Sequence, residues 1–139
     1  MADEERSELV RLLKQRAGDN LRGVAHYHED GYELLYVRDE VARRYDDDRF
    51  AELFSTIREE MSERAQQESV YELGRLHCTV RLFDEGIVLN FSQGDRLGTS
   101  VSLDPEAASN LTTFAYECIR RLHRDSPQTV VAEPAWLNK

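Results

Sequence analysis

The sequence predicts an α+β domain in which helices pack on a five-stranded antiparallel sheet, in the order α-ββ-α-βββ-α. Three observations predict this class. Apolar and polar residues alternate on both sides of glycine-containing turns, an apolar stripe at helical spacing runs through residues 49–67, and an Asp-Pro pair at 104–105 marks the start of a closing helix. A chain of 139 residues suits one domain. We expect this domain to span residues 1–124, with residues 125–139 as a tail that is loosely ordered or docks on a partner.

The N-terminal third is predicted to form a helix followed by a hairpin. Residues 4–17 carry leucines at three- and four-residue spacing, and Gly18 follows as a stop signal. The next twenty residues are rich in β-branched and aromatic side chains and are divided by Glu29-Asp30-Gly31. An Asp-Gly pair between strand formers is the strongest short-range hairpin signal.

Two histidines lie in the first predicted strand. Residues two apart share a strand face, so His26 and His28 point the same way, which permits two ligands of a metal site. Further ligands would have to come from elsewhere in the chain. The alternative is a pair of ordinary histidines on a half-exposed strand, and we expect no bound metal.

The central helix carries the clearest apolar stripe in the chain. Asp46, Asp47 and Asp48 precede it and complement the positive end of its dipole. The stripe must be covered by the chain's own sheet or by a second copy, and its residues are therefore the candidate interaction surface: Phe50, Leu53, Phe54, Ile57 and Met61.

Three more strands are predicted after the central helix. Residues 71–83 alternate and place Arg75 and His77 on one face; turns at 84–86 and 93–95 then lead into strands over 87–92 and 96–103. If the first and third strands are neighbours, Arg75 and His77 join His26 and His28 as a candidate anion or metal cluster. Cys78 lies on the face opposite His77, so the two cannot act as nucleophile and base.

Composition restricts the habitat and the partners. The chain has 27 acidic and 18 basic residues, and only two of the basic residues are lysines. Acid-rich, lysine-poor composition is typical of proteins from salt-accumulating halophiles, because concentrated salt screens the repulsion among the acids. An acidic protein encoded by a GC-rich genome is the alternative. The net charge of −9 disfavours nucleic acid as a partner, although Arg38, Arg43, Arg44 and Arg49 cluster among acidic residues.

No familiar catalytic or cofactor motif is present in the sequence. Glycine-rich phosphate loops are missing, the two cysteines are too far apart for a zinc signature or a disulfide framework, and no apolar run approaches the length of a membrane span. We therefore expect no cofactor, no catalytic residue and no membrane association, and a cytoplasmic location.

The element order resembles the Roadblock/LC7 fold, a profilin-like relative of longin domains. The resemblance is carried by the hairpin around Glu29-Asp30-Gly31, the amphipathic helix from Arg49, and the three-stranded meander that follows. It implies a homodimer through the central helix or a sheet edge, and a regulatory or scaffold role. In composition the chain also resembles small proteins of halophilic archaea, a resemblance that implies no activity.

Three functions from different classes follow from these features. The first is a non-enzymatic, homodimeric interaction module. The second is a small ligand- or metal-binding sensor or enzyme that uses the histidine and arginine strand face. The third is a DNA-associated accessory protein that uses the Arg38 to Arg49 cluster.

Overall fold

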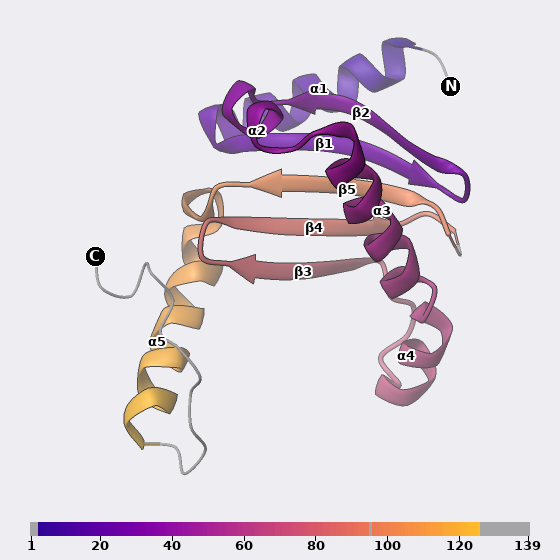
Figure 1. Ribbon diagram of the computed structural model, residues 1–139. Coiled ribbons are helices and arrows are strands. Elements are labelled where there is room, and N and C mark those ends of the chain that lie inside the picture. Colours follow the sequence, from indigo (N-terminus) through magenta and orange to yellow (C-terminus); the bar gives the residue numbers. More distant parts are fainter. Residues whose placement is uncertain (1–2, 95, 126–139) are drawn as a thin grey trace.

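The computed structural model describes residues 3–94 and 96–125, and it confirms the α+β class. A five-stranded antiparallel sheet in the order β2-β1-β5-β4-β3 lies between helices on its two faces (Figure 1). The strands are β1 (Leu21–His28), β2 (Gly31–Val37), β3 (Cys78–Phe83), β4 (Gly86–Ser92) and β5 (Gly98–Leu103). The helices are α1 (Asp3–Ala17), α2 (Asp39–Arg44), α3 (Asp47–Met61), α4 (Arg64–Tyr71) and α5 (Ser109–Asp125), with 3-10 turns η1 (Gly18–Asn20) and η2 (Pro105–Ala108).

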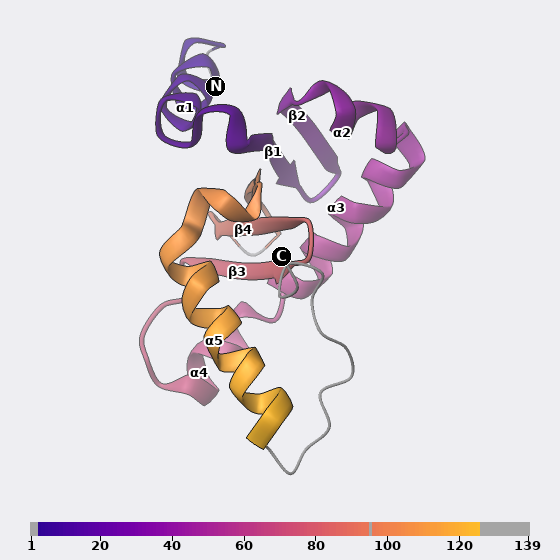
Figure 2. The same ribbon diagram turned by 90° about the vertical axis from the view of Figure 1, so that its left-hand side faces the viewer.

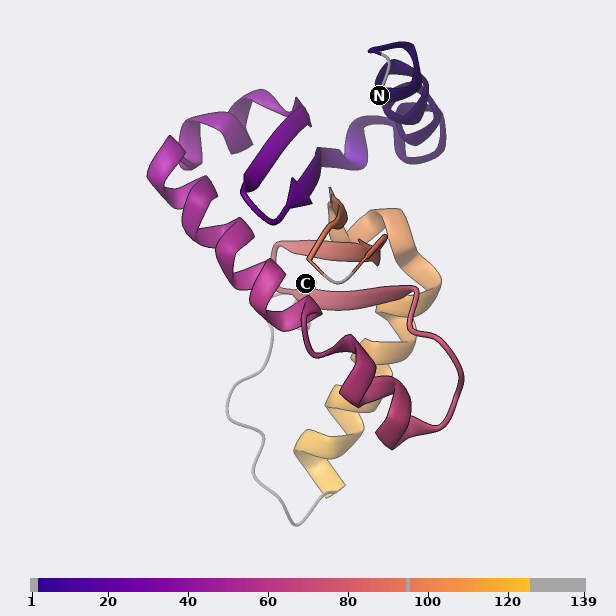
Figure 3. The same cartoon turned by 90° about the vertical axis from the view of Figure 1, so that its right-hand side faces the viewer.

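Helices α1 and α3 cover opposite faces of the sheet (Figures 2 and 3). Under α1, a cluster of Leu21, Val24 and Val101 is buried almost completely. Under α3, the buried residues come from both layers: Ala25, Tyr27, Phe50, Phe54, Ile57 and Met61. Burial of each large apolar side chain contributes about 1.5–3 kcal/mol before entropy is subtracted, so these two clusters hold the layers together.

The first hairpin and the start of the central helix form as predicted. Strands β1 and β2 are joined at Glu29 and Asp30 and pair antiparallel. The Asp46 side chain accepts a hydrogen bond of 2.8 Å from the Arg49 backbone N–H, which is a helix N-cap.

The single helix predicted for residues 49–67 is wrong, because the structure contains two helices there. Helix α3 ends at Met61, and α4 begins at Arg64. The Ser62 hydroxyl donates to the Glu59 carbonyl oxygen at 2.7 Å. A side chain that bonds to the local backbone in this way competes with the helical hydrogen bonds, which favours a break at this position.

The strand predicted to begin at residue 71 is also shorter than expected. Residues 64–71 are helical, and the chain then passes through left-handed conformations at Glu72 (φ 55°) and Gly74 (φ 92°). The Glu68 carboxylate accepts the Leu76 backbone N–H at 2.7 Å and holds this loop against α4. Alternation in residues 71–77 therefore did not reflect a strand, and Leu73 is 85% exposed.

The start of the closing helix differs in detail from the prediction. A 3-10 turn precedes α5, and the Asp104 side chain does not cap a backbone N–H. Its two carboxylate oxygens instead accept hydrogen bonds of 2.8 and 2.9 Å from Arg38 at the end of β2. The predicted tail, residues 125–139, lies outside the described residues from position 126 onward.

Candidate functional site

The predicted interaction stripe on the central helix lies mostly inside the domain. Phe50, Phe54, Ile57 and Met61 are each less than a tenth exposed, because they pack against the chain's own sheet. Leu53 alone keeps substantial exposure, at 38%. The stripe thus serves as the core under α3, and a partner that docks on this helix in its present position meets Leu53 rather than the other four.

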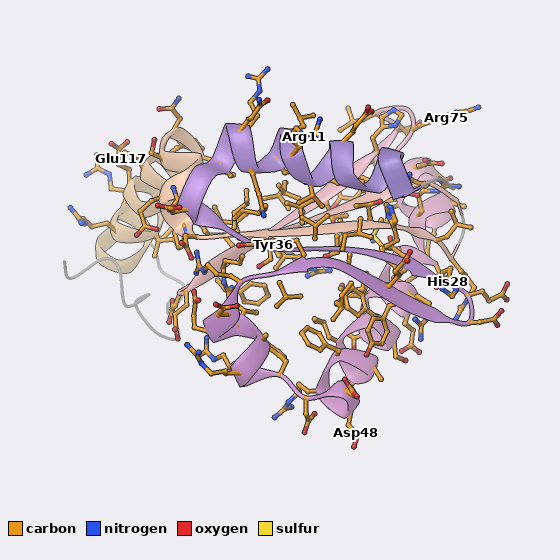
Figure 4. The ribbon with its side chains drawn as sticks, turned by 90° about the horizontal axis from the view of Figure 1, so that it is seen from above. Arg11, His28, Tyr36, Asp48, Arg75 and Glu117 are labelled. Carbon is orange, nitrogen blue, oxygen red and sulfur yellow. The ribbon has the colours of Figure 1, made fainter. Side chains whose placement is uncertain are left out.

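The four residues of the predicted anion or metal cluster do not come together. Strands β1 and β3 are separated by β5 and β4, which places them about 14 Å apart at the usual strand spacing. Arg75 and His77 lie in the loop before β3 rather than in a strand. Figure 4 shows His28 at the tip of the first hairpin and Arg75 on a separate segment. Within residues 3–94 and 96–125, no group of three or more His, Cys, Asp or Glu side chains is placed to hold a metal ion.

His26 is held by a hydrogen bond to the neighbouring strand β5. Its Nδ1 lies 2.8 Å from the Thr99 hydroxyl on β5, and that hydroxyl donates to the Gln93 side chain at 2.6 Å. This polar chain fixes the imidazole on the α1 face of the sheet.

Three of the four clustered arginines are engaged by acidic partners. Arg38 binds Asp104 and Glu40, while Arg44 pairs with Glu85 at 3.5 Å and Arg49 with Glu52 at 3.8 Å. Phosphate binding would have to displace these carboxylates, which weakens the case for a nucleic-acid surface.

An apolar surface remains on the α1 face, where the sheet continues beyond α1. We call it the β3–β4 patch, and it consists of Cys78, Val80, Leu82, Leu89 and Phe91. Cross-strand pairing places Val80 opposite Leu89 and Cys78 opposite Phe91, so all five side chains share one face. Val80 is 48% exposed and Phe91 is 40% exposed.

The patch runs to an open edge of the sheet. Strand β3 is the last strand in the sheet order, so one side of its backbone has no neighbouring strand among the described residues. Cys78 at the start of this edge is half-buried, and burial raises the pKa of its thiol. The thiol is therefore a poor nucleophile at neutral pH and contributes to the patch as an apolar group.

A second apolar surface lies along α5. Leu111, Phe114, Cys118 and Leu122 recur at helical spacing, and all four side chains are exposed. The helix contacts mainly the 3-10 turn before it and extends past β3 instead of lying on the sheet (Figures 2 and 3). We call these four residues the α5 stripe.

The sequence pattern shows the apolar face of residues 76–82 and the apolar side of the last helix, but it does not show whether either is covered. Their exposure depends on where α1 and α5 lie, which no local pattern encodes. The available signal was the number of amphipathic elements, since three long helices and one small sheet leave more apolar surface than the two faces of that sheet can cover.

The described helices include none that is both long enough and apolar enough to cross a membrane. Comparison with protein families matches residues 7–123 to a family described as a domain of unknown function (DUF7522), and the chain belongs to that family. No curated protein matches the chain.

Proposed function

We propose that this member of the DUF7522 family acts as a non-enzymatic, homodimeric interaction module. The observation that carries the proposal is the β3–β4 patch, which leads directly to the open edge of β3. Exposed apolar surface that is continuous with an unpaired strand edge marks a site of association between chains.

The proposed dimer pairs β3 of one copy with β3 of the other in antiparallel orientation. A two-fold axis relates the copies, so each contributes the same surface and the two sheets join into one. Val80 and Leu82 of the two copies then lie on one continuous apolar face. Main-chain hydrogen bonds across the edge supply the pairing, as in other cases of strand addition.

The edge alone is too small for a stable dimer. Six residues of strand span about 20 Å, whereas a stable interface buries about 800 Å² on each partner. The α5 stripe supplies further apolar area, because α5 already extends past β3 toward the side on which the second copy would sit (Figure 2). In the dimer each α5 covers the β3–β4 patch of the other copy.

Two further features support a regulatory or scaffold role in a salt-rich cytoplasm. The element order resembles that of the Roadblock/LC7 fold, which implies homodimers that organise other proteins. The acid-rich, lysine-poor composition suits high salt, where the hydrophobic contacts of the proposed interface persist while repulsion between two copies of charge −9 is screened.

The test is the molar mass in solution, measured by size-exclusion chromatography with light scattering in molar KCl. The native chain is expected at twice its 16.1 kDa. Val80→Lys is expected to give the monomer, because the dimer would bury a charge whose desolvation cost salt does not remove.

A matched control is Leu12→Lys on α1. Leu12 is also 48% exposed, but it belongs neither to the β3–β4 patch nor to the open edge of β3. This variant is expected to remain dimeric. A native chain that is monomeric at every concentration contradicts the proposal, and so does equal dissociation of the two lysine variants.

A further inference from the structure

A cavity of about 390 Å³ lies between the sheet and the α2–α3 layer, on the face opposite the β3–β4 patch. Figure 4 shows the two layers from above, with side chains projecting into the space between them. Its walls are mainly apolar, and they include Ala25, Val41, Phe50, Phe54, Ile57 and Val88. Ligand cavities in proteins typically measure about 300–1,000 Å³, so this one has room for a small molecule.

One wall of the cavity carries a cation without a carboxylate partner. Arg22 on β1 is half-buried, and its Nη1 donates to the Ser102 hydroxyl at 3.4 Å, a long hydrogen bond. No acidic side chain in the described part of the chain pairs with it. By contrast, Arg44 at the rim of the same cavity is paired with Glu85, and both of these side chains are largely exposed.

The backbone of β4 makes room for the Arg22 guanidinium. A Cβ atom at Gly86 would lie 2.5 Å from Arg22 Nη1, so glycine at this position allows the guanidinium to lie directly against the strand. The guanidinium is thus held at the cavity wall next to the Ser102 hydroxyl, and Ser100 on the same strand also lines the cavity.

This arrangement favours a ligand with one negative charge and an apolar body. A half-buried cation loses part of its hydration, and an anion that accepts its hydrogen bonds restores that loss. A carboxylate matches the planar fork of a guanidinium and can also accept from the serine hydroxyls. The apolar walls disfavour nucleotides and sugars, whose polar groups would find few partners there.

We propose that this cavity binds a small amphipathic carboxylate, with its carboxylate on Arg22 and Ser102 and its apolar body against α2 and α3. At about 30 Å³ for each water molecule, the cavity holds the equivalent of roughly a dozen waters, which is enough room for a medium-chain fatty acid or an aryl-alkyl acid. Glu85 at the rim does not repel the ligand strongly, because Arg44 neutralises it.

The experiment is isothermal titration calorimetry of the full chain in molar KCl with three probes. Octanoate and 4-phenylbutyrate test the aliphatic and the aryl form of the ligand, and 1-octanol has the same chain as octanoate without its charge. Either acid is expected to bind at least about tenfold more tightly than the alcohol, since a hydrogen bond to a charged group contributes that much or more.

Four variants test whether the acid binds in this cavity. Arg22→Gln is expected to lower the affinity for the acid about tenfold or more while leaving the alcohol unaffected, and Arg43→Gln, an exposed arginine on α2, serves as the control of equal charge. Gly86→Ala is expected to weaken acid binding by displacing the guanidinium, and Val88→Phe to block both acid and alcohol by filling the cavity. Urea unfolding establishes that each variant is folded.

Three results would overturn the proposal. The first is that the native chain binds neither acid, and the second is that octanol binds as tightly as octanoate. The third is that the Arg22→Gln and Arg43→Gln variants bind the acid equally well.

Discussion

Substitution of Arg38 by glutamine removes an ion pair that joins the end of the first hairpin to the turn before α5. The guanidinium donates to both oxygens of Asp104, at 2.8 and 2.9 Å, and to the Asp19 carbonyl oxygen at 2.7 Å. The hydrogen bonds to Asp104 raise the pKa of Arg38, so it stays charged at any pH at which the protein is folded.

The expected loss of stability follows from the exposure of the pair. Removing one partner of a fully buried ion pair costs about 3–5 kcal/mol, but Arg38 and Asp104 each keep 24% of their side-chain surface, so water solvates part of the stranded carboxylate. We expect Arg38→Gln to lower the free energy of unfolding by about 2 kcal/mol.

Urea unfolding followed by circular dichroism measures this loss. The matched control is Arg49→Gln, because Arg49 and Glu52 are 3.8 Å apart and are 65% and 71% exposed. Such a surface pair contributes no more than about 1 kcal/mol, and less in concentrated salt. Equal losses for the two variants would refute the reasoning, as would a loss for Arg38→Gln that disappears in molar KCl.

Three further outcomes follow from buried groups. Gly98→Ala is expected to cost about 3 kcal/mol in urea unfolding, because a Cβ there would overlap the Phe91 carbonyl oxygen and the Tyr27 ring; a loss below about 1 kcal/mol would contradict that packing. Burial raises the pKa of Tyr27 above its ordinary 10.0, so the native state holds its proton longer than the unfolded state and stability falls as pH rises above about 10. Tyr27→Phe should remove that fall without loss at neutral pH, because the hydroxyl has no hydrogen-bond partner in the described structure; a large loss at pH 7 would be inconsistent with this. In the monomeric Val80→Lys variant, where no partner covers the α5 stripe, iodoacetamide at pH 8 is expected to modify exposed Cys118 before Cys78, whose pKa burial raises, and peptide mass spectrometry that finds the reverse order would disprove it.

The sequence predicted those features that depend only on residues close together in the chain. The Asp30-Gly31 turn, the Asp46 cap and the stripe of Phe50, Phe54 and Ile57 each act over a few residues, and each formed where expected. Helix α2 was missed because six residues are too few to show a period.

Contacts between distant residues could not be predicted in this way. Asp104 has the position and the residue type of a helix cap, yet it binds Arg38, which is 66 residues away and adjacent only after the sheet has formed. The same limit applies to the candidate sites. His26 and His77 share a residue type, but the strand order separates them, whereas Arg22 and Gly86 are brought together by it.

The distance between two spin labels across β3 tests the proposed dimer most directly. In a chain with Cys78 and Cys118 replaced by alanine, which keeps both positions apolar, Asp84→Cys places one label in the exposed turn just after β3. If the two β3 strands pair antiparallel with Val80 opposite Val80, which keeps the apolar faces of the two copies on one side, position 84 of one copy lies opposite position 76 of the other. The two labelled backbones are then eight residues, or about 27 Å, apart. Double electron–electron resonance in molar KCl is expected to give a distance near this value, and a signal without intermolecular coupling, or a distance beyond about 40 Å, would contradict the account.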